Sequence, residues 1–90
     1  MNPYIITYDL VNEKNYRALI EKIKEYPDAA HVQESVWLVH YQEQEFGSRE
    51  IRNNLKTVID GDDNLFIAKL TGEAAWRFSI DDESSVREAL

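Results

Sequence analysis

Near the start of the chain, residues 4–10 read Tyr-Ile-Ile-Thr-Tyr-Asp-Leu, a mainly apolar run in which Asp9 is the one charged residue. β-Branched and aromatic side chains dominate this run, and apolar residues fall on both faces of the extended chain, which is typical of a central strand. Asp9 stands near its end, just before a polar stretch and a helical pattern. Because α/β and α+β folds place ligand-binding groups at the ends of core strands, Asp9 is the first candidate site residue.

The spacing of apolar residues changes after this strand. Apolar side chains recur at helical intervals from Tyr16 to Tyr26, and Pro27 ends the pattern. Residues 29–41 are too rich in β-branched residues for a helix and too long for one ordinary strand. We therefore expect two short strands there, with a sharp reversal at the polar pair Glu34-Ser35.

A second helix and a fourth strand complete the pattern. Ser48 is the expected N-cap of the helix, and the Asp- and Gly-rich residues 60–63 form a turn that ends it. Residues 65–71 have the pattern of a strand, which Gly72 closes. The resulting order, β-α-β-β-α-β, predicts a ferredoxin-like α+β sandwich. The apolar stripe of the second helix consists of Ile51, Leu55, Val58 and Ile59.

The length of the chain, 90 residues, predicts a single domain. We expect its core at residues 3–72 and a C-terminal extension at residues 73–90. In the extension Trp76, Phe78 and Ile80 alternate with polar residues, which predicts a fifth strand. In a homodimer this strand can pair with the edge of the partner's sheet and so hide both edges, and we favour that arrangement.

The chain then predicts a short last helix. Residues 82–84, Asp-Glu-Ser, can cap it, and we expect it to run through Ala89. Because it is short and terminal, this helix is expected to fray.

The charge of the chain limits its partners. Ten Lys and Arg residues stand against seventeen Asp and Glu residues, which gives a net charge of −7. Sequence-independent binding to phosphate backbones is driven by counterion release, so this charge opposes it, and any nucleic-acid contact must be local. The absence of cysteine excludes a disulfide framework and a thiolate zinc site. With no apolar run near about 18 residues and no signal-peptide pattern, we expect a cytoplasmic protein without a membrane partner.

One basic feature is coherent enough to contact phosphates. Arg49, Arg52 and Lys56 share one face of the second helix by their three- and four-residue spacing. Such a row can bind a nucleic-acid backbone. The alternative is an ordinary solvated helix face, with Glu50 and Asp60 close by.

The sequence gives little support to a zinc site, a calcium loop or base-stacking tryptophans. His31 and His40 are the only histidines, and no third ligand stands at a recognisable spacing, so we expect ordinary strand residues and not a zinc site. The acidic turn at residues 60–63 resembles the start of a calcium loop but lacks the glycine and glutamate that an EF-hand requires. Trp37 and Trp76 can stack on bases, but aromatic residues in strand patterns more often belong to a core or an interface.

Two segments carry a resemblance to a known family. Tyr8-Asp9 and Gln33-Glu34-Ser35-Val36-Trp37 resemble the small CRISPR-associated adaptation protein, second in the Cas naming series, and its SinR-like and VapD-like relatives. In those families the first strand typically ends Tyr-Asp, and a Gln-x-Ser-Val-aromatic segment follows the first helix. Residues 70–73, Leu-Thr-Gly-Glu, followed by Trp76, are closer to the SinR-like branch. The likeness covers nearly the whole chain.

The resemblance implies a homodimer in which the two Asp9 side chains face each other across the two-fold axis. In the members that act as nucleases a divalent ion, Mg²⁺ or Mn²⁺, lies between them. Mg²⁺ prefers hard oxygen ligands and keeps several waters, so one carboxylate from each subunit can suffice. Tyr8 points to the opposite face and is a poor second ligand, whereas Ser35 can lie near the two-fold axis and bond a phosphate or a water. Alternatively, Asp9 only caps the loop at residues 11–15 or the first helix.

The family pattern is not followed everywhere. The adaptation proteins usually carry basic residues soon after the first strand, whereas here Val11-Asn12-Glu13 precedes Lys14 and Arg17. Three functions therefore stay open. The first is a metal-dependent phosphodiesterase or endoribonuclease that acts on RNA or DNA. The second is a non-catalytic acidic dimer that recruits a protein partner, and the third is an inhibitor that imitates nucleic acid.

Overall fold

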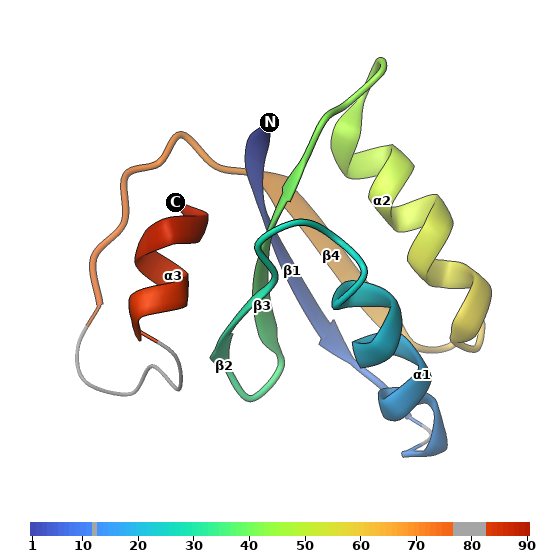
Figure 1. Ribbon diagram of the computed structural model, residues 1–90. Helices are drawn as coiled ribbons and strands as arrows, with labels where there is room; N and C mark the ends of the chain where they lie inside the picture. Colours follow the sequence, from blue (N-terminus) through green and yellow to red (C-terminus); the bar gives the residue numbers. More distant parts are fainter. Residues whose placement is uncertain (12, 77–82) are drawn as a thin grey trace.

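A four-stranded antiparallel sheet forms the centre of the fold, with the strand order β2-β3-β1-β4 (Figure 1). The computed structural model describes residues 1–11, 13–76 and 83–90. The central strand β1 is bonded on one side to β3 and on the other to β4, which leaves β2 and β4 as the edges of this sheet. The strands are β1 (Asn2–Asp9), β2 (Ala30–Gln33), β3 (Val36–Tyr41) and β4 (Asn64–Lys69).

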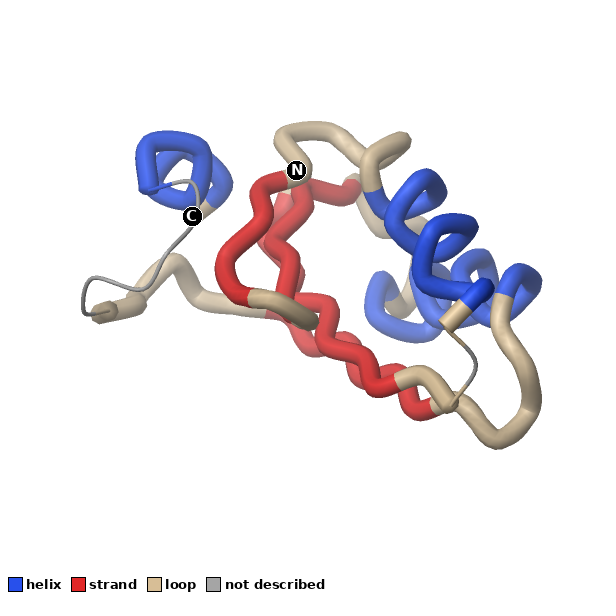
Figure 2. The backbone as a smooth tube through the Cα atoms, turned by 90° about the horizontal axis from the view of Figure 1, so that it is seen from below, coloured by secondary structure: helices blue, strands red, loops and turns tan. Residues whose placement is uncertain are grey.

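Helices cover the two faces of the sheet unequally. Figure 2 shows α1 and α2 on one side of the strands and the C-terminal helix on the other. The helices are α1 (Lys14–Ile23), α2 (Gly47–Leu55), the 3₁₀ turn η1 (Lys56–Val58) and α3 (Glu83–Ala89). The order β1-α1-β2-β3-α2-β4 confirms the ferredoxin-like α+β prediction, and α3 confirms the short last helix through Ala89. None of the described helices is long and apolar enough to span a bilayer.

The larger core lies between the sheet and the helices α1 and α2. The predicted stripes of both helices contribute to it, because they face the alternate residues of β1 and β3. Inside it the indole N–H of Trp37 donates a 3.1 Å hydrogen bond to the hydroxyl of Tyr8. Both side chains are buried, so Trp37 is a core residue. The buried members are Tyr4, Ile6, Tyr8, Leu10, Leu19, Ile23, Trp37, Val39, Ile51 and Leu55.

A second, smaller cluster holds α3 against the opposite face of the sheet. Val86 and Ala89 of α3 pack on Ala30 of β2 and Leu38 of β3. Trp76 is partly buried against the same cluster. The helix contacts β2 and β3, so the half of this face that β1 and β4 provide keeps exposed groups, above all Phe66 at 63% exposure.

The boundaries of the two long helices differ from the sequence prediction. α1 ends at Ile23, and the residues up to Tyr26 continue as turns, although Tyr26 still packs on the core. Ser48 is not the N-cap of α2, because the helix already begins at Gly47 and Phe46 is its N-cap. The capping group is a carboxylate instead: Glu50 reaches back and accepts the backbone N–H of Phe46 at 2.8 Å.

Both predicted reversals are present. The pair Glu34-Ser35 separates β2 from β3, and the backbone N–H of Asp63 bonds the carbonyl of Asp60 at 3.1 Å in the acidic turn. The predicted fifth strand falls largely on residues 77–82, which lie outside the described residues, as does the proposed capping position at Asp82.

Candidate functional site

Asp9 is the last residue of β1 and is exposed to solvent. In the ladder with β4 its partner is Asn64. Because side chains alternate along a strand, Asp9 shares a face with Thr7, while the buried Tyr8 points into the helical layer as the sequence predicts. Thr7, Asp9, Asn64 and Phe66 line a shallow hollow of about 340 Å³.

The carboxylate of Asp9 is not used to hold the fold together. Among the described residues none gives it a hydrogen bond or an ion pair, and the N-cap of α1 is Glu13, without a side-chain cap. The loop after β1 is held by another acid: Asp63 accepts the backbone N–H of Val11 at 2.7 Å and the amide of Asn15 at 3.2 Å. The capping role that was the alternative for Asp9 therefore belongs to Asp63, which sequence spacing did not single out.

The groups around Asp9 are oxygen donors. The side chains of Thr7 and Asn64 line the same hollow and carry a hydroxyl and an amide carbonyl, which together with a carboxylate suit Mg²⁺ or Mn²⁺. Over the described residues, however, no group of three or more Asp, Glu, His or Cys side chains is placed to hold a metal ion. One chain thus offers Asp9 as a single charged ligand.

Ser35 lies in the turn between β2 and β3. Its carbonyl accepts the backbone N–H of Tyr8 at 3.2 Å, so it is close to the end of β1. It lines a different hollow, of about 320 Å³, together with Tyr8, Glu13, Tyr16, Ile20 and Glu34. Within one chain, Ser35 and Asp9 therefore line separate hollows that have Tyr8 in common.

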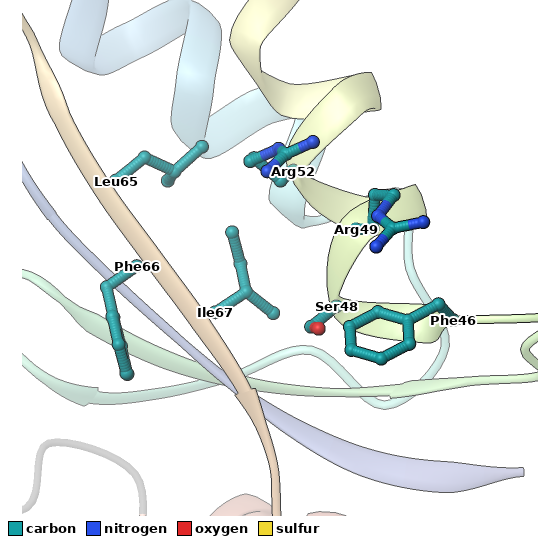
Figure 3. Close-up of a pocket in the computed structure, with 7 residues that line it drawn as sticks. All are labelled: Phe46, Ser48, Arg49, Arg52, Leu65, Phe66 and Ile67. Atoms are coloured by element: carbon teal, nitrogen blue, oxygen red, sulfur yellow. The ribbon is translucent and has the colours of Figure 1, made fainter.

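The basic row is divided by the end of α2. Arg49 and Arg52 lie on the helix, whereas Lys56 lies in η1 because the α-helix ends at Leu55. The two arginines line a hollow of about 260 Å³ between α2 and the edge strand β4 (Figure 3). Its other lining residues are Phe46, Ser48, Leu65, Phe66 and Ile67.

Glu50, the carboxylate next to Arg49 in the chain, binds groups other than the basic row. Glu50 accepts the hydroxyl of Tyr41 at 2.8 Å and backbone N–H groups of Gln44, Glu45 and Phe46. The backbone N–H groups of Glu45 and Gln44 are the main reason that the pKa of Glu50 falls to about 2, and the hydrogen bond to Glu50 raises the pKa of Tyr41 to about 12.

The arginines are consequently not neutralised by their neighbours. In the part of the chain that the structure describes, no carboxylate forms an ion pair with Arg49, Arg52 or Lys56. Arg52 donates to the side-chain oxygen of Asn53 at 3.0 Å. Arg49 lies 4.8 Å above the ring centre of Phe46, a cation–π contact that keeps its guanidinium at the start of α2.

The histidines take structural positions. The ring of His31 stacks on that of Trp37 with 4.6 Å between centroids, and Nδ1 of His40 lies 2.7 Å from a carboxylate oxygen of Asp28. They are strand residues, as predicted.

Sequence reasoning missed Phe66. Strand alternation contained the signal, because Leu65 and Ile67 point toward α2 and Phe66 must then point to the other side of β4, as Figure 3 shows.

Comparison with known proteins identifies the family. A family model described as CRISPR associated protein Cas2 matches residues 1–77. The chain belongs to the Cas2 family. Residues 1–77 of this Cas2-family chain include Asp9, Ser35 and the three basic residues, and the family makes it a nucleic-acid-related protein of CRISPR adaptation.

A solved structure supports the fold of the Cas2-family chain. It is the crystal structure of a hypothetical protein, TT1823, from Thermus thermophilus, with a TM-score of 0.70 and 23% sequence identity. The match covers 84% of this chain and 89% of the other. At this identity the likeness shows the fold alone. No curated protein matches the chain significantly.

Proposed function

We propose that this Cas2-family protein is a homodimeric, divalent-metal-dependent endonuclease that cleaves RNA or DNA. The observation that carries the proposal is the state of Asp9, an exposed carboxylate at the end of the central strand that forms no hydrogen bond or ion pair with any described residue. The Asp9 carboxylate lies beside the oxygen atoms of Thr7 and Asn64 and is therefore available to bind a metal ion.

Two copies of the chain are needed because the described residues of each offer a single carboxylate, that of Asp9, in this hollow. With one Asp9 from each subunit, two carboxylates would hold a Mg²⁺ or Mn²⁺ ion, and such an ion readily keeps waters as its other ligands. When bound, the ion supplies an activated water and positive charge that offsets the charge building on the phosphoryl oxygens. Water then forms a new P–O bond as the phosphodiester P–O bond breaks, which leaves a phosphate on one product and a hydroxyl on the other.

The remaining site residues have distinct tasks in this proposal. Ser35, in the turn beside the end of β1, hydrogen-bonds a phosphate or a water once two subunits meet. Arg49, Arg52 and Lys56 contact the phosphate backbone away from the scissile bond. Their charge is local, which reconciles nucleic-acid contact with a net charge of −7.

The sheet gives two reasons to expect the dimer. Both β2 and β4 present unpaired edges in the described sheet, and α3 leaves exposed the half of one face that carries Phe66. The alternating residues Trp76, Phe78 and Ile80 can supply the strand that covers a partner's edge. Within the family we place the chain in the SinR-like or VapD-like branch, and residues 70–73, followed by Trp76, favour the SinR-like one. We expect the protein in the cytoplasm.

The test is a pair of acid-to-amide variants. Asp9→Asn should abolish Mg²⁺- or Mn²⁺-dependent cleavage of RNA or DNA and keep the dimer in light-scattering chromatography, because the side chain keeps its shape and loses only its charge. Asp62→Asn, in the nearby exposed turn, is the matched control and should cleave normally. A cleaving Asp9→Asn protein, a parent that never cleaves, or a monomeric parent would refute the proposal.

The acidic composition favours a second function, a non-catalytic dimeric adaptor or nucleic-acid mimic that binds a protein partner. Seventeen acidic side chains on a chain of 90 residues present a surface complementary to a basic groove. A salt-sensitive complex with a basic nucleic-acid-binding protein, together with no binding of RNA or DNA, would favour this function over the nuclease.

A further inference from the structure

The residue at the N-cap of α2 departs from the usual rule for that position. An N-cap side chain commonly carries an oxygen that accepts a backbone N–H of the first turn, as in Ser, Thr, Asp or Asn. Phe46 stands there instead and forms no side-chain cap. Its side chain is 56% exposed, so the fold gains neither a cap nor a fully buried ring. A local rule that is broken without a gain in stability is typical of a functional position.

The backbone of Phe46 is nevertheless held on both sides. The carboxylate of Glu50 accepts its N–H at 2.8 Å, and the backbone N–H of Glu50 donates to its carbonyl at 3.1 Å. The same carboxylate binds the backbone N–H groups of the two preceding residues, Gln44 and Glu45. The ring therefore extends from a backbone that is fixed before any ligand binds.

The ring of Phe46 lies against Arg49, three residues further along. Residues three apart are neighbours on the surface of a helix, and the guanidinium carbon of Arg49 is 4.8 Å from the ring centroid, within the range of a cation–π contact. Figure 3 shows the two side chains next to each other at the start of α2. The ring thus restrains the guanidinium on the α2 side of the hollow between α2 and β4.

The two arginines of this hollow are restrained in different ways. Arg52 donates from Nε and Nη2 to the side-chain oxygen of Asn53, at 3.3 and 3.0 Å. Arg49 donates to no oxygen atom of the described residues. Because a phenyl ring has no oxygen acceptor, it orders Arg49 and leaves all five N–H donors of the guanidinium without an oxygen partner. Those donors can bind a phosphate through two N–H groups at once.

We propose that Phe46 is a positioning residue, whose ring holds the guanidinium of Arg49 in place for a phosphate group of the bound nucleic acid. The inference rests on the proposed function, because it takes Arg49 as a phosphate contact. Ordering a long, exposed side chain on binding costs conformational entropy, and the ring removes part of that cost in advance. Arg49 belongs to α2, which lies on the other side of the sheet from the face that a second copy of the chain would cover.

The first experiment measures dissociation constants for short fluorescent RNA and DNA oligonucleotides, both single-stranded and duplex, in EDTA and over a range of KCl concentrations. Phe46→Leu removes the ring and keeps an apolar side chain. It should weaken binding at low salt about 2- to 5-fold, the ratio that corresponds to an exposed cation–π contact. Single strands and duplexes should be affected alike, because phosphate contacts carry no base information. Phe46→Tyr keeps the aromatic face and should bind like the parent.

A double-mutant cycle then shows whether the ring acts through Arg49. Arg49→Gln should reduce the slope of log Kd against log salt by roughly 0.7–0.9, which is the loss of one phosphate contact. Adding Phe46→Leu to Arg49→Gln should change the affinity no further. Adding it to Arg52→Gln, the matched control, should weaken binding by the same factor as in the parent.

A spectrum of the protein without ligand tests the contact itself. The ring current should shift the NMR signal of the Nε proton of Arg49 upfield in the parent and in Phe46→Tyr, and this shift should vanish in Phe46→Leu. The Nε proton of Arg52, which is bonded to Asn53, is the internal control and should not move. Melting temperatures and light scattering should match those of the parent, because the backbone of Phe46, and not its ring, holds the start of α2.

Four results would overturn the inference. The first is a Phe46→Leu protein that binds nucleic acid like the parent. The second is a full loss of affinity from Phe46→Leu in the Arg49→Gln background. The third is a loss confined to single strands, which would mean that the ring contacts bases directly. The fourth is a parent without the ring-current shift at Arg49 or without affinity for nucleic acid.

The two proposals can fail separately. A parent that never cleaves, but in which Phe46→Leu weakens binding only while Arg49 is present, supports the positioning role and refutes only the nuclease. Cleavage that is lost in Asp9→Asn, together with unchanged binding in Phe46→Leu, has the opposite meaning.

Discussion

The hydroxyl of Tyr41 donates a 2.8 Å hydrogen bond to the carboxylate of Glu50. This contact joins β3 to the start of α2, and the same carboxylate binds three backbone N–H groups of the preceding loop. A carboxylate at a helix N-terminus also interacts favourably with the helix dipole. Glu50 therefore sets where α2 begins, and with it the position of Arg49 and Arg52.

The first prediction concerns acid. The pKa of Glu50 is lowered to about 2 from an ordinary 4.5, and that of Glu43 is lowered to about 2 by hydrogen bonds from Asn2 and Lys69. A lowered pKa in the folded state means stability that is fully present above the unfolded pKa and is lost as pH falls from about 4.5 through about 2. Urea unfolding at successive pH values should show this decline.

The matched variants identify its source. Glu50→Gln and Glu43→Gln should each have a lower unfolding free energy at pH 7, and that free energy should fall less steeply as the pH is lowered. Glu45→Gln is the control and should follow the parent, because the Glu45 side chain does not accept the hydrogen bonds that Glu43 and Glu50 accept. A decline of equal steepness in all variants would assign acid unfolding to other carboxylates.

The second prediction concerns the tight contact between Gly47 and Tyr4. A methyl group at Gly47 would overlap the hydroxyl of the buried Tyr4. Gly47→Ala should therefore cost about 1–3 kcal/mol of unfolding free energy, which is typical of overpacking. Gly61→Ala is the control, because nothing lies within 4 Å of its added carbon. Chemical denaturation measures both, and equal stability of the two variants would contradict the overlap.

The third prediction concerns the buried bond between Trp37 and Tyr8. Tyr8→Phe removes the acceptor of the indole N–H inside the core. An unsatisfied buried donor costs about 1–3 kcal/mol, so the variant should lose that amount of stability. The nuclease activity that we propose should stay unchanged per folded molecule, because Tyr8 is buried and points to the opposite face from Asp9. Loss of activity without loss of stability would instead place Tyr8 in the site.

The fourth prediction separates two neighbouring acids. Asp63→Ala removes the acceptor for Val11 and for the backbone N–H of Asp60, so its melting temperature should fall. Removal of a comparable capping group costs about 0.5–2 kcal/mol. Asp9→Ala should melt like the parent, because the carboxylate of Asp9 bonds none of the residues that the structure describes. A lower melting temperature for Asp9→Ala would indicate a structural role for that acid.

Much of the fold followed from local patterns. The run at residues 4–10, the helical spacing of Tyr16 to Ile23 and the reversal at Glu34-Ser35 all identify elements that the structure contains. Helix ends were harder to predict. Ser48 has the chemistry of an N-cap, yet the N-cap of α2 is Phe46, two residues earlier, and Glu50 binds the loop from within the helix. A side chain that reaches backward competes with local propensity in a way that residue spacing does not reveal.

The candidate site was only partly predictable for the same reason. Asp9 was identified by its place at the end of a strand, but only the structure shows that the loop after this strand is bonded by Asp63, from a turn more than fifty residues away, and that Asp9 bonds no described residue. Likewise, the spacing of Arg49 and Arg52 placed them on one face, but only the packing of α2 beside β4 brought Leu65 and Ile67 to the same hollow.

By itself the sequence determined the order of the elements, the buried faces of β1, α1 and α2, and the exposed acid that ends the central strand, because apolar periodicity and strand alternation act over a few neighbouring residues. Only the tertiary structure decided which carboxylates of the described residues accept hydrogen bonds within the fold, and which hollows lie next to each other. The reason is that these features join residues that are far apart in the chain. Asp63 and Glu50 form such hydrogen bonds, and β4 forms a wall that two hollows share.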